Sequence, residues 1–200
     1  MAEMPHKIEL DACPHCSVNR PNLTLHMKCE TRGYAGQNPR NWAGYACTNC
    51  GGVVMVSARP GANSIDEMYP TPTQPDLEIP AIARDYLGQA MRSLHAPSGA
   101  VMLAASAVDS MLKAKGYKKG SLNDRIDAAA KDHLITEEMS KWAHQVRLEA
   151  NEQRHADEAV SLPSDQDAAR CLDFASALGK FLFTFPSRVE KGLKESAKAS

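Results

Sequence analysis

The chain has 200 residues, of which 43% are hydrophobic, and its formal net charge is −1. This length suffices for one ordinary domain, or for a medium domain and a small one. The nearly neutral charge excludes the overall basic character of many nucleic-acid-binding proteins. No apolar run approaches the ~18 residues of a membrane span, and the N-terminus lacks the apolar core of a signal peptide. We therefore expect a soluble cytoplasmic protein with reduced thiols and no membrane partner.

Residues 1–58 contain two short runs with the composition of β-strands, 23–28 and 51–58, bounded by Gly, Pro, Asn or Cys. A module of this size buries too little apolar surface to be stable alone, and such modules usually need a metal or disulfide link. We predict that residues 1–58 form a small β zinc ribbon.

Four of the six cysteines form two Cys-x-x-Cys pairs, Cys13 with Cys16 and Cys47 with Cys50. Two intervening residues let both thiolates of a pair bind one ion, and two pairs complete the tetrahedral shell of a structural Zn²⁺. The alternative is free or redox cysteines, but a redox Cys-x-x-Cys motif normally occurs once, beside a parallel sheet. Because four sulfurs leave no open coordination position, we expect a structural rather than a catalytic zinc.

Other potential metal ligands lie near these pairs, and we interpret His15, His26 and Cys29 as non-ligands because the four cysteines already close the shell. Cys171 falls on the apolar stripe of the last predicted helix, which indicates a buried packing thiol rather than a nucleophile.

The stretch 28–45 mixes basic and aromatic residues. Cations that contact phosphates and rings that stack on bases are typical of single-strand recognition. The candidate nucleic-acid-binding residues are Lys28, Arg32, Arg40 and Trp42. Alternatively, Trp42 and Tyr45 form the small core of the ribbon itself, since so small a module needs its aromatic residues for packing.

Proline marks the boundary between two modules, because residues 60–80 hold five of the twelve prolines. Proline fixes φ and lacks an amide donor, so this stretch is neither an internal helix nor a central strand. We predict an extended Pro-rich linker or strap over residues 59–79.

Residues 80–200 show helical periodicity and short loops, which predict an all-α bundle. The expected helices are 79–95, 98–116, 121–133, 136–156 and 164–185. Each of the last four begins with a residue suited to the N-cap: Ser98, Ser121, Thr136 and Ser164. Pro186 is expected to end the last helix and to leave a frayed tail over 187–200.

The helix predicted at 136–156 carries Arg147, Asn151 and His155 at four-residue intervals, on a face distinct from its apolar stripe. In metal-free RNA cleavage a histidine acts as general acid or base, and an arginine stabilises the transition-state charge. Two-fold pairing of chains would bring two such sets together. The alternatives are an ordinary solvated face, or a dimer or partner seam. Asp109 is an acid in an apolar helix, and either Arg147 or His155 serves as its partner or Asp109 lies on a narrow solvated stripe of that helix.

Two segments resemble the bacterial family called domain of unknown function 4145: "IPAIARDYLGQAMRSLHAPSGAVMLAASAVDSMLKAKG" and "LNDRIDAAAKDHLITEEMSKWAHQVRLEANEQRHAD". The front segment "CPHC…WAGYACTNCGG" resembles the zinc-ribbon form of that family. The resemblance covers roughly residues 10–190. The family is similar to the HEPN superfamily of small, often dimeric helical bundles, many of which are metal-independent ribonucleases in toxin, phage-defence and RNA-processing systems. The resemblance therefore implies a HEPN-like helical bundle.

The HEPN motif is an arginine, usually followed by a polar residue, with a histidine four to six residues on. His155 matches the histidine and Asn151 the polar residue, whereas Ala150 stands where active members carry arginine. The nearest upstream arginine is Arg147. For an active enzyme, the resemblance implies His155 as acid or base, Arg147 as phosphate clamp and Asn151 as positioner.

The resemblance thus implies an RNA-directed protein in phage defence or a toxin system, with metal-independent endoribonuclease activity if it is an enzyme. The alternative is a non-catalytic dimeric module that binds nucleic acid or protein. The first expected partner is a second copy of the chain. The second is either a nucleic acid, RNA rather than DNA, or a protein of a defence system. A third hypothesis, nucleotidyl modification, has Tyr86 and Tyr117 as available acceptors.

Overall fold

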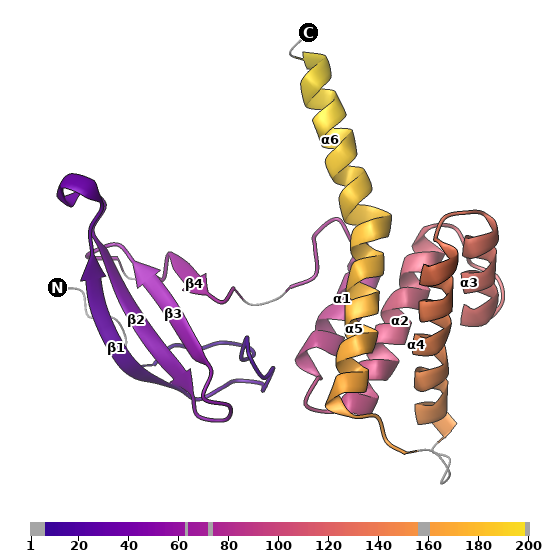
Figure 1. The fold of residues 1–200 in the computed structure, drawn as a ribbon, viewed down its shortest axis with the longest axis horizontal. Coiled ribbons are helices and arrows are strands. Elements are labelled where there is room, and N and C mark those ends of the chain that lie inside the picture. The colour runs from indigo at the N-terminus through magenta and orange to yellow at the C-terminus, as the bar shows by residue number, and fades with distance from the viewer. Residues whose placement is uncertain (1–6, 63, 72–73, 156–160, 199–200) are drawn as a thin grey trace. The chain divides into compact units, whose positions relative to one another are not determined.

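The computed structural model describes residues 7–62, 64–71, 74–155 and 161–198, without the side chains of residues 152–155 and 198. The chain divides into two compact units, residues 1–73 and 74–200 (Figure 1), each of which is described by itself. None of the helices among the described residues is both long and apolar enough to cross a membrane.

The first unit is a four-stranded antiparallel sheet in the order β1-β2-β3-β4 (Figure 1). Its strands are β1 (Leu23–Thr31), β2 (Arg40–Cys47), β3 (Val53–Ala58) and β4 (Glu67–Tyr69). The runs predicted at 23–28 and 51–58 correspond to β1 and β3, whereas β2 and β4 were not predicted. In β2, Gly44 interrupts the β pattern, and a Cβ there would lie 2.6 Å from Met27 Cγ and 2.9 Å from Met55 Sδ, so any larger residue would displace these methionine side chains.

The two faces of this sheet differ in burial, as alternation along the strands requires. One face holds the core, in which Tyr45, Val54 and Val56 are fully buried. The prediction that Tyr45 belongs to the ribbon core is confirmed. Trp42 lies on the other face and is half-buried. Its indole N–H donates to Thr31 Oγ1 at 2.8 Å, and its ring centroid lies 6.2 Å from that of Tyr69.

The stretch predicted as a linker, 59–79, has more structure than expected. It contributes β4, which pairs with β3 through Met55 and Tyr69. A short edge strand is the place where a Pro-rich segment can join a sheet, since one side needs no partner. The end of the stretch belongs to the second unit, where Ile79 is 2% exposed in the helical core.

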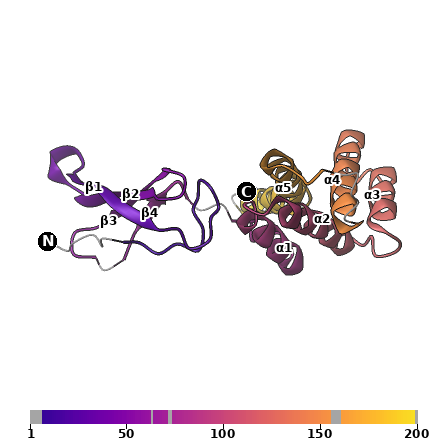
Figure 2. The ribbon, with the colours of Figure 1, turned by 90° about the horizontal axis from the view of Figure 1, so that it is seen from below.

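The second unit is helical. Its elements are α1 (Ala81–Arg92), α2 (Pro97–Ala114), α3 (Leu122–Lys131), α4 (Glu137–His155), α5 (Asp165–Gly179), a π-helical turn (Lys180–Thr184) and α6 (Phe185–Lys198). Figure 2 views these helices nearly along their axes, with α2 between α1 and α4, and α3 on the outer side of α4. α2 packs against α1, α3, α4 and α5, as expected for a helix that is apolar almost all round.

Helix starts follow the predicted caps in three of four cases. Ser121 and Ser164 each form a complete capping box, with Asp124 and Asp167 respectively. Thr136 Oγ1 accepts the amide of Met139 at 3.2 Å. The prediction for Ser98 is wrong, because α2 begins earlier, at Pro97. Proline is well suited to a first helical position, where its missing amide would have no helical partner.

The prediction that Pro186 ends the last helix is also wrong. The chain stays helical through Pro186 to Lys198, and α5 and α6 form one long rod that projects beyond the other helices (Figure 1). The π turn explains this, since the amide of Phe185 donates to the carbonyl of Lys180, five residues back. A wider turn relieves the clash between a proline ring and the carbonyl four residues before it.

Candidate functional site

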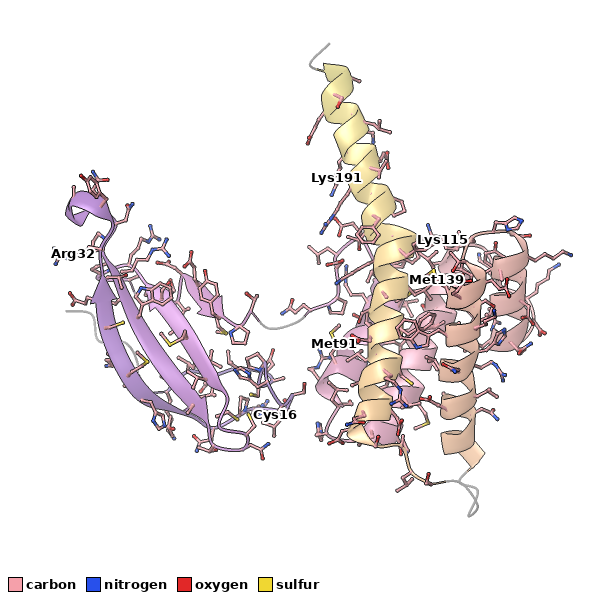
Figure 3. The ribbon with its side chains drawn as sticks, in the orientation of Figure 1. Cys16, Arg32, Met91, Lys115, Met139 and Lys191 are labelled. Atoms are coloured by element: carbon pink, nitrogen blue, oxygen red, sulfur yellow. The ribbon has the colours of Figure 1, made fainter. Side chains whose placement is uncertain are left out.

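The four cysteines of the two Cys-x-x-Cys pairs form one cluster in the ribbon unit. Their Sγ atoms all lie within 4.8 Å of one another, and Cys13 Sγ is 3.9 Å from Cys50 Sγ. A tetrahedral ion with metal–sulfur distances of about 2.3 Å holds its sulfurs roughly 3.8 Å apart. Cys16 marks this cluster at the end of the sheet where β2 turns into β3 (Figure 3). The four cysteines could therefore hold a metal ion, and the arrangement is consistent with a zinc ribbon.

Hydrogen bonds prepare these sulfurs for a metal. The amide of His15 donates to Cys13 Sγ and that of Gly52 to Cys50 Sγ, both at 3.4 Å. Burial raises the pKa of the Cys16 thiol, but donation from the Val18 amide and the Asn49 side chain outweighs it and holds the pKa at about 6. A thiolate is the form that binds metal, so these donors favour the metal-binding form of Cys16, whereas burial raises the pKa of the Cys13 thiol.

The predicted non-ligands lie outside the cluster. The His15 ring is hydrogen-bonded through Nε2 to the carbonyl of Val53 at 2.9 Å, and Cys29 is exposed. Cys171 is 1% exposed in the helical core, and its thiol donates to Glu149 Oε2 at 2.8 Å. Burial raises the pKa of Cys171 far above its usual range, and the carboxylate adds to the shift. A thiol this hard to ionise is unsuited to nucleophilic attack.

Gly52 permits the close approach of the two cysteine turns. A Cβ on Gly52 would lie 2.5 Å from Cγ and Cδ2 of His15, which stands between Cys13 and Cys16. We expect Gly52→Ala to push this turn away, to weaken metal binding and to destabilise the ribbon by about 1–3 kcal/mol. Metal affinity measured by competition with a chromophoric chelator would check this. The double variant with His15→Ala should recover part of the loss, and an unchanged affinity in Gly52→Ala would contradict the prediction.

The helical unit contains a pocket of about 500 Å³, walled by α1, α2, α3 and α4. Its polar and charged lining residues are Tyr86, Ser106, Asp109, Ser110, Lys113, Ser121, Asn123, Arg125, Arg147 and Asn151. Ile82, Ala105, Leu122 and Ala150 complete the wall. Ligand-binding pockets are concave and usually mostly apolar with a few polar groups, whereas this lining is mostly polar, which suits a charged ligand.

The carboxylate of Asp109 is held by two cations. Arg125 donates to it at 2.7 Å and Lys113 Nζ lies 2.5 Å away. The expected partner, Arg147, lines the same pocket but does not form this ion pair. Arg125 instead reaches the carboxylate from α3, and Lys113 reaches it from the next turn of α2, the helix that carries Asp109. Three cations against one carboxylate give the described lining residues a net charge of +2.

Both arginines of the pocket contain an unused donor. The Nε atoms of Arg125 and Arg147 are buried and have no hydrogen-bond partner. Arg147 also has no carboxylate partner among the residues that the structure describes. A buried donor without an acceptor costs roughly 1–3 kcal/mol, but protein atoms cover these two Nε groups, so an anion in the pocket would meet the positive charge of the lining rather than the Nε–H donors themselves. The pocket is therefore able to bind an anion.

The sequence of most of the helical unit matches one protein family. The sequence model described as Domain of unknown function (DUF4145) matches residues 89–196, which is more than half of the chain. The chain belongs to this family. The match begins within α1 and ends within α6, so it includes the pocket walls from α2, α3 and α4. No curated protein and no solved structure matches the chain.

Within the DUF4145 helices, Arg147 and Asn151 both line the pocket, one helical turn apart on α4. The side chain of His155, the last residue of α4, lies outside the described residues. Sequence reasoning missed Arg125 and Lys113, because they come from other helices and no spacing relates them to Arg147. The available signal was Asp109, an acid in an apolar helix, which indicated cations nearby.

The basic residues predicted on the ribbon do not share one face. Arg40 and Trp42 lie on the same face, where Arg40 donates to Glu67 at 2.5 Å. Lys28 is paired with Ala43, which faces the core, and so lies on the opposite face. Arg32 is exposed just beyond β1, at the end of the sheet away from Cys16 (Figure 3). A ligand would have to wrap around the sheet edge to reach all four.

Proposed function

We propose that this DUF4145 protein is an RNA-binding module whose HEPN-like helical unit holds an RNA phosphate between Arg125 and Arg147. The observation that carries the proposal is Arg147, a partly buried cation that lines a pocket without a carboxylate partner among the described residues. Arginine is suited to this role, because its planar fork matches the oxygens of a phosphate. In the ribbon, the ion held by the four cysteines is Zn²⁺, which prefers four thiolates in a tetrahedron.

The pocket favours binding over cleavage. Among the described lining residues the one carboxylate is Asp109, which is already paired with Arg125 and Lys113. No imidazole lines the pocket in the part of the chain that the structure describes. Ala150, at the position where active HEPN members carry arginine, is 3% exposed and forms part of the wall. The protein therefore acts as a non-catalytic phosphate-binding module.

The binding proposal predicts a specific loss in Arg147→Gln. A hydrogen bond to a charged group contributes about 1.5–3 kcal/mol, so affinity for single-stranded RNA should fall about tenfold or more. Fluorescence anisotropy with a labelled oligoribonucleotide at fixed salt measures this. Arg170→Gln is the matched control, because Arg170 is exposed on α5 and pairs with Asp167 outside the pocket. Equal affinities of the two variants would contradict the proposal.

A metal-independent endoribonuclease is the second candidate, because Arg147 and Asn151 share the pocket and His155 follows on the same side of α4. Incubation of purified protein with RNA in EDTA separates the two functions. Intact RNA supports the binding module. Cleavage that leaves 2′,3′-cyclic phosphate ends and disappears in His155→Ala would replace it with the nuclease.

A further inference from the structure

The size of the pocket suits a small ligand. Its volume of about 500 Å³ lies within the range of roughly 300–1,000 Å³ of small-molecule sites. Four helices contribute walls, so the site is a concavity in the bundle. Proteins that bind the middle of a strand usually offer a long basic groove instead. The shape therefore favours one nucleotide over a continuous backbone.

The charge of the pocket suits a dianion. In the part of the lining that the structure describes, Lys113, Arg125, Arg147 and Asp109 sum to a net charge of +2. A phosphate monoester carries about −1.5 to −2 at pH 7, whereas each phosphate within a strand carries −1. A terminal phosphate thus neutralises the lining, and an internal phosphodiester leaves it with excess positive charge.

The two arginines approach from different helices, Arg125 from α3 and Arg147 from α4. Their Nε atoms are covered by protein, so a phosphate would accept from the terminal guanidinium nitrogens, of which those of Arg125 also donate to Asp109 and to the carbonyl of Lys118. A terminal phosphate has three non-bridging oxygens, enough to accept from both guanidinium groups at once.

On the α1 side, the pocket is lined by an aliphatic and an aromatic side chain instead of charged groups. Ile82 and Tyr86 are four residues apart and so lie on the same face of α1, and they are 67% and 38% exposed. An exposed ring beside a cationic site can stack on a base. Asn123 and Asn151 add amide groups that can both donate to and accept from a ribose or a base edge.

We infer that the pocket binds a terminal phosphate monoester carried by a nucleoside, with the phosphate at Arg125 and Arg147 and the base against Tyr86. This inference rests on the proposed function and specifies its ligand. The chemistry is shared by two sources, a free nucleoside monophosphate and the phosphorylated end of an RNA.

The test compares oligoribonucleotides of one sequence with a 5′-phosphate, a 3′-phosphate or only hydroxyl ends, by competition anisotropy with the full chain. One phosphorylated end should bind at least tenfold more tightly than the hydroxyl form, and Arg147→Gln should abolish the difference. Calorimetry with nucleoside monophosphates, nucleosides and inorganic phosphate identifies the source. Affinity for monophosphates equal to that for the RNA end indicates the free nucleotide, and preference for the oligonucleotide indicates the RNA end.

Tyr86→Ala separates base stacking from phosphate binding. It should weaken nucleoside monophosphate binding several-fold and leave inorganic phosphate binding unchanged. Equal binding of phosphorylated and hydroxyl RNAs, still dependent on Arg147, would overturn the inference and leave the proposed function standing. Absence of RNA binding by the wild-type chain would overturn the proposed function, and absence of both RNA and nucleoside monophosphate binding would overturn the inference as well.

Discussion

Cys50→Ser should abolish metal binding and unfold the ribbon unit while the helical unit stays folded. In zinc-finger peptides a structural Zn²⁺ contributes an apparent 10–16 kcal/mol to folding, which is as large as the whole stability of a typical domain, about 5–15 kcal/mol. Cys50 is exposed in the turn between β2 and β3, so serine there removes a ligand without disturbing the core. Metal content by mass spectrometry and amide dispersion by NMR of the full chain would measure both effects.

Cys29→Ser is the matched control for this experiment. Cys29 is an exposed cysteine of the same unit, on β1 and outside the cluster. This variant should keep one metal ion per chain and the wild-type ribbon spectrum. If Cys50→Ser also kept the metal and the dispersed spectrum, the four-sulfur site would be wrong. Chelation of the wild-type metal should reproduce the effect of Cys50→Ser.

Phe174→Ala should destabilise the helical unit by about 3–5 kcal/mol, the usual cost of removing a buried phenyl ring. Phe174 is 1% exposed on α5, and its ring centroid lies 5.1 Å from that of Trp142 on α4. The melting temperature should fall by roughly 10 °C or more. Thermal unfolding followed by circular dichroism reports the helices, and tryptophan fluorescence reports the contact to Trp142.

Phe185→Ala provides the comparison, because it removes the same phenyl ring at a position on α6 where the side chain is 52% exposed. Its effect should stay within about 0.5 kcal/mol, as for most surface substitutions. Comparable losses in the two variants would show that the position of α6 or the burial of Phe174 has been misassigned.

Local signals in the sequence were reliable where the physical cause is local. Two intervening residues are enough to aim both thiolates of a Cys-x-x-Cys pair at one ion, and the four sulfurs do cluster. A serine followed three residues later by an acid is enough to cap a helix, and Ser121 and Ser164 both do so. Such features depend on neighbours in the chain, which the sequence shows directly.

Other features required contacts between distant residues. β2 contains Gly44, a weak strand former, which is tolerated because Met27 and Met55 fill the space of its missing side chain. The helix continues through Pro186 because a π turn precedes it, and the buried Thr184 of that turn donates to Asp76 at 2.8 Å, across 108 residues of sequence.

By itself, the sequence determined which four cysteines cluster, the division into a small sheet and a helical bundle, and the placement of Arg147 and Asn151 on a polar face of α4. Only the tertiary structure decided that this face lines a pocket, that Arg125 rather than Arg147 holds Asp109, and that Arg147 keeps an unused buried donor. The reason is that charge pairing depends on distances between helices, whereas ligand spacing and capping depend on the order of residues along one chain.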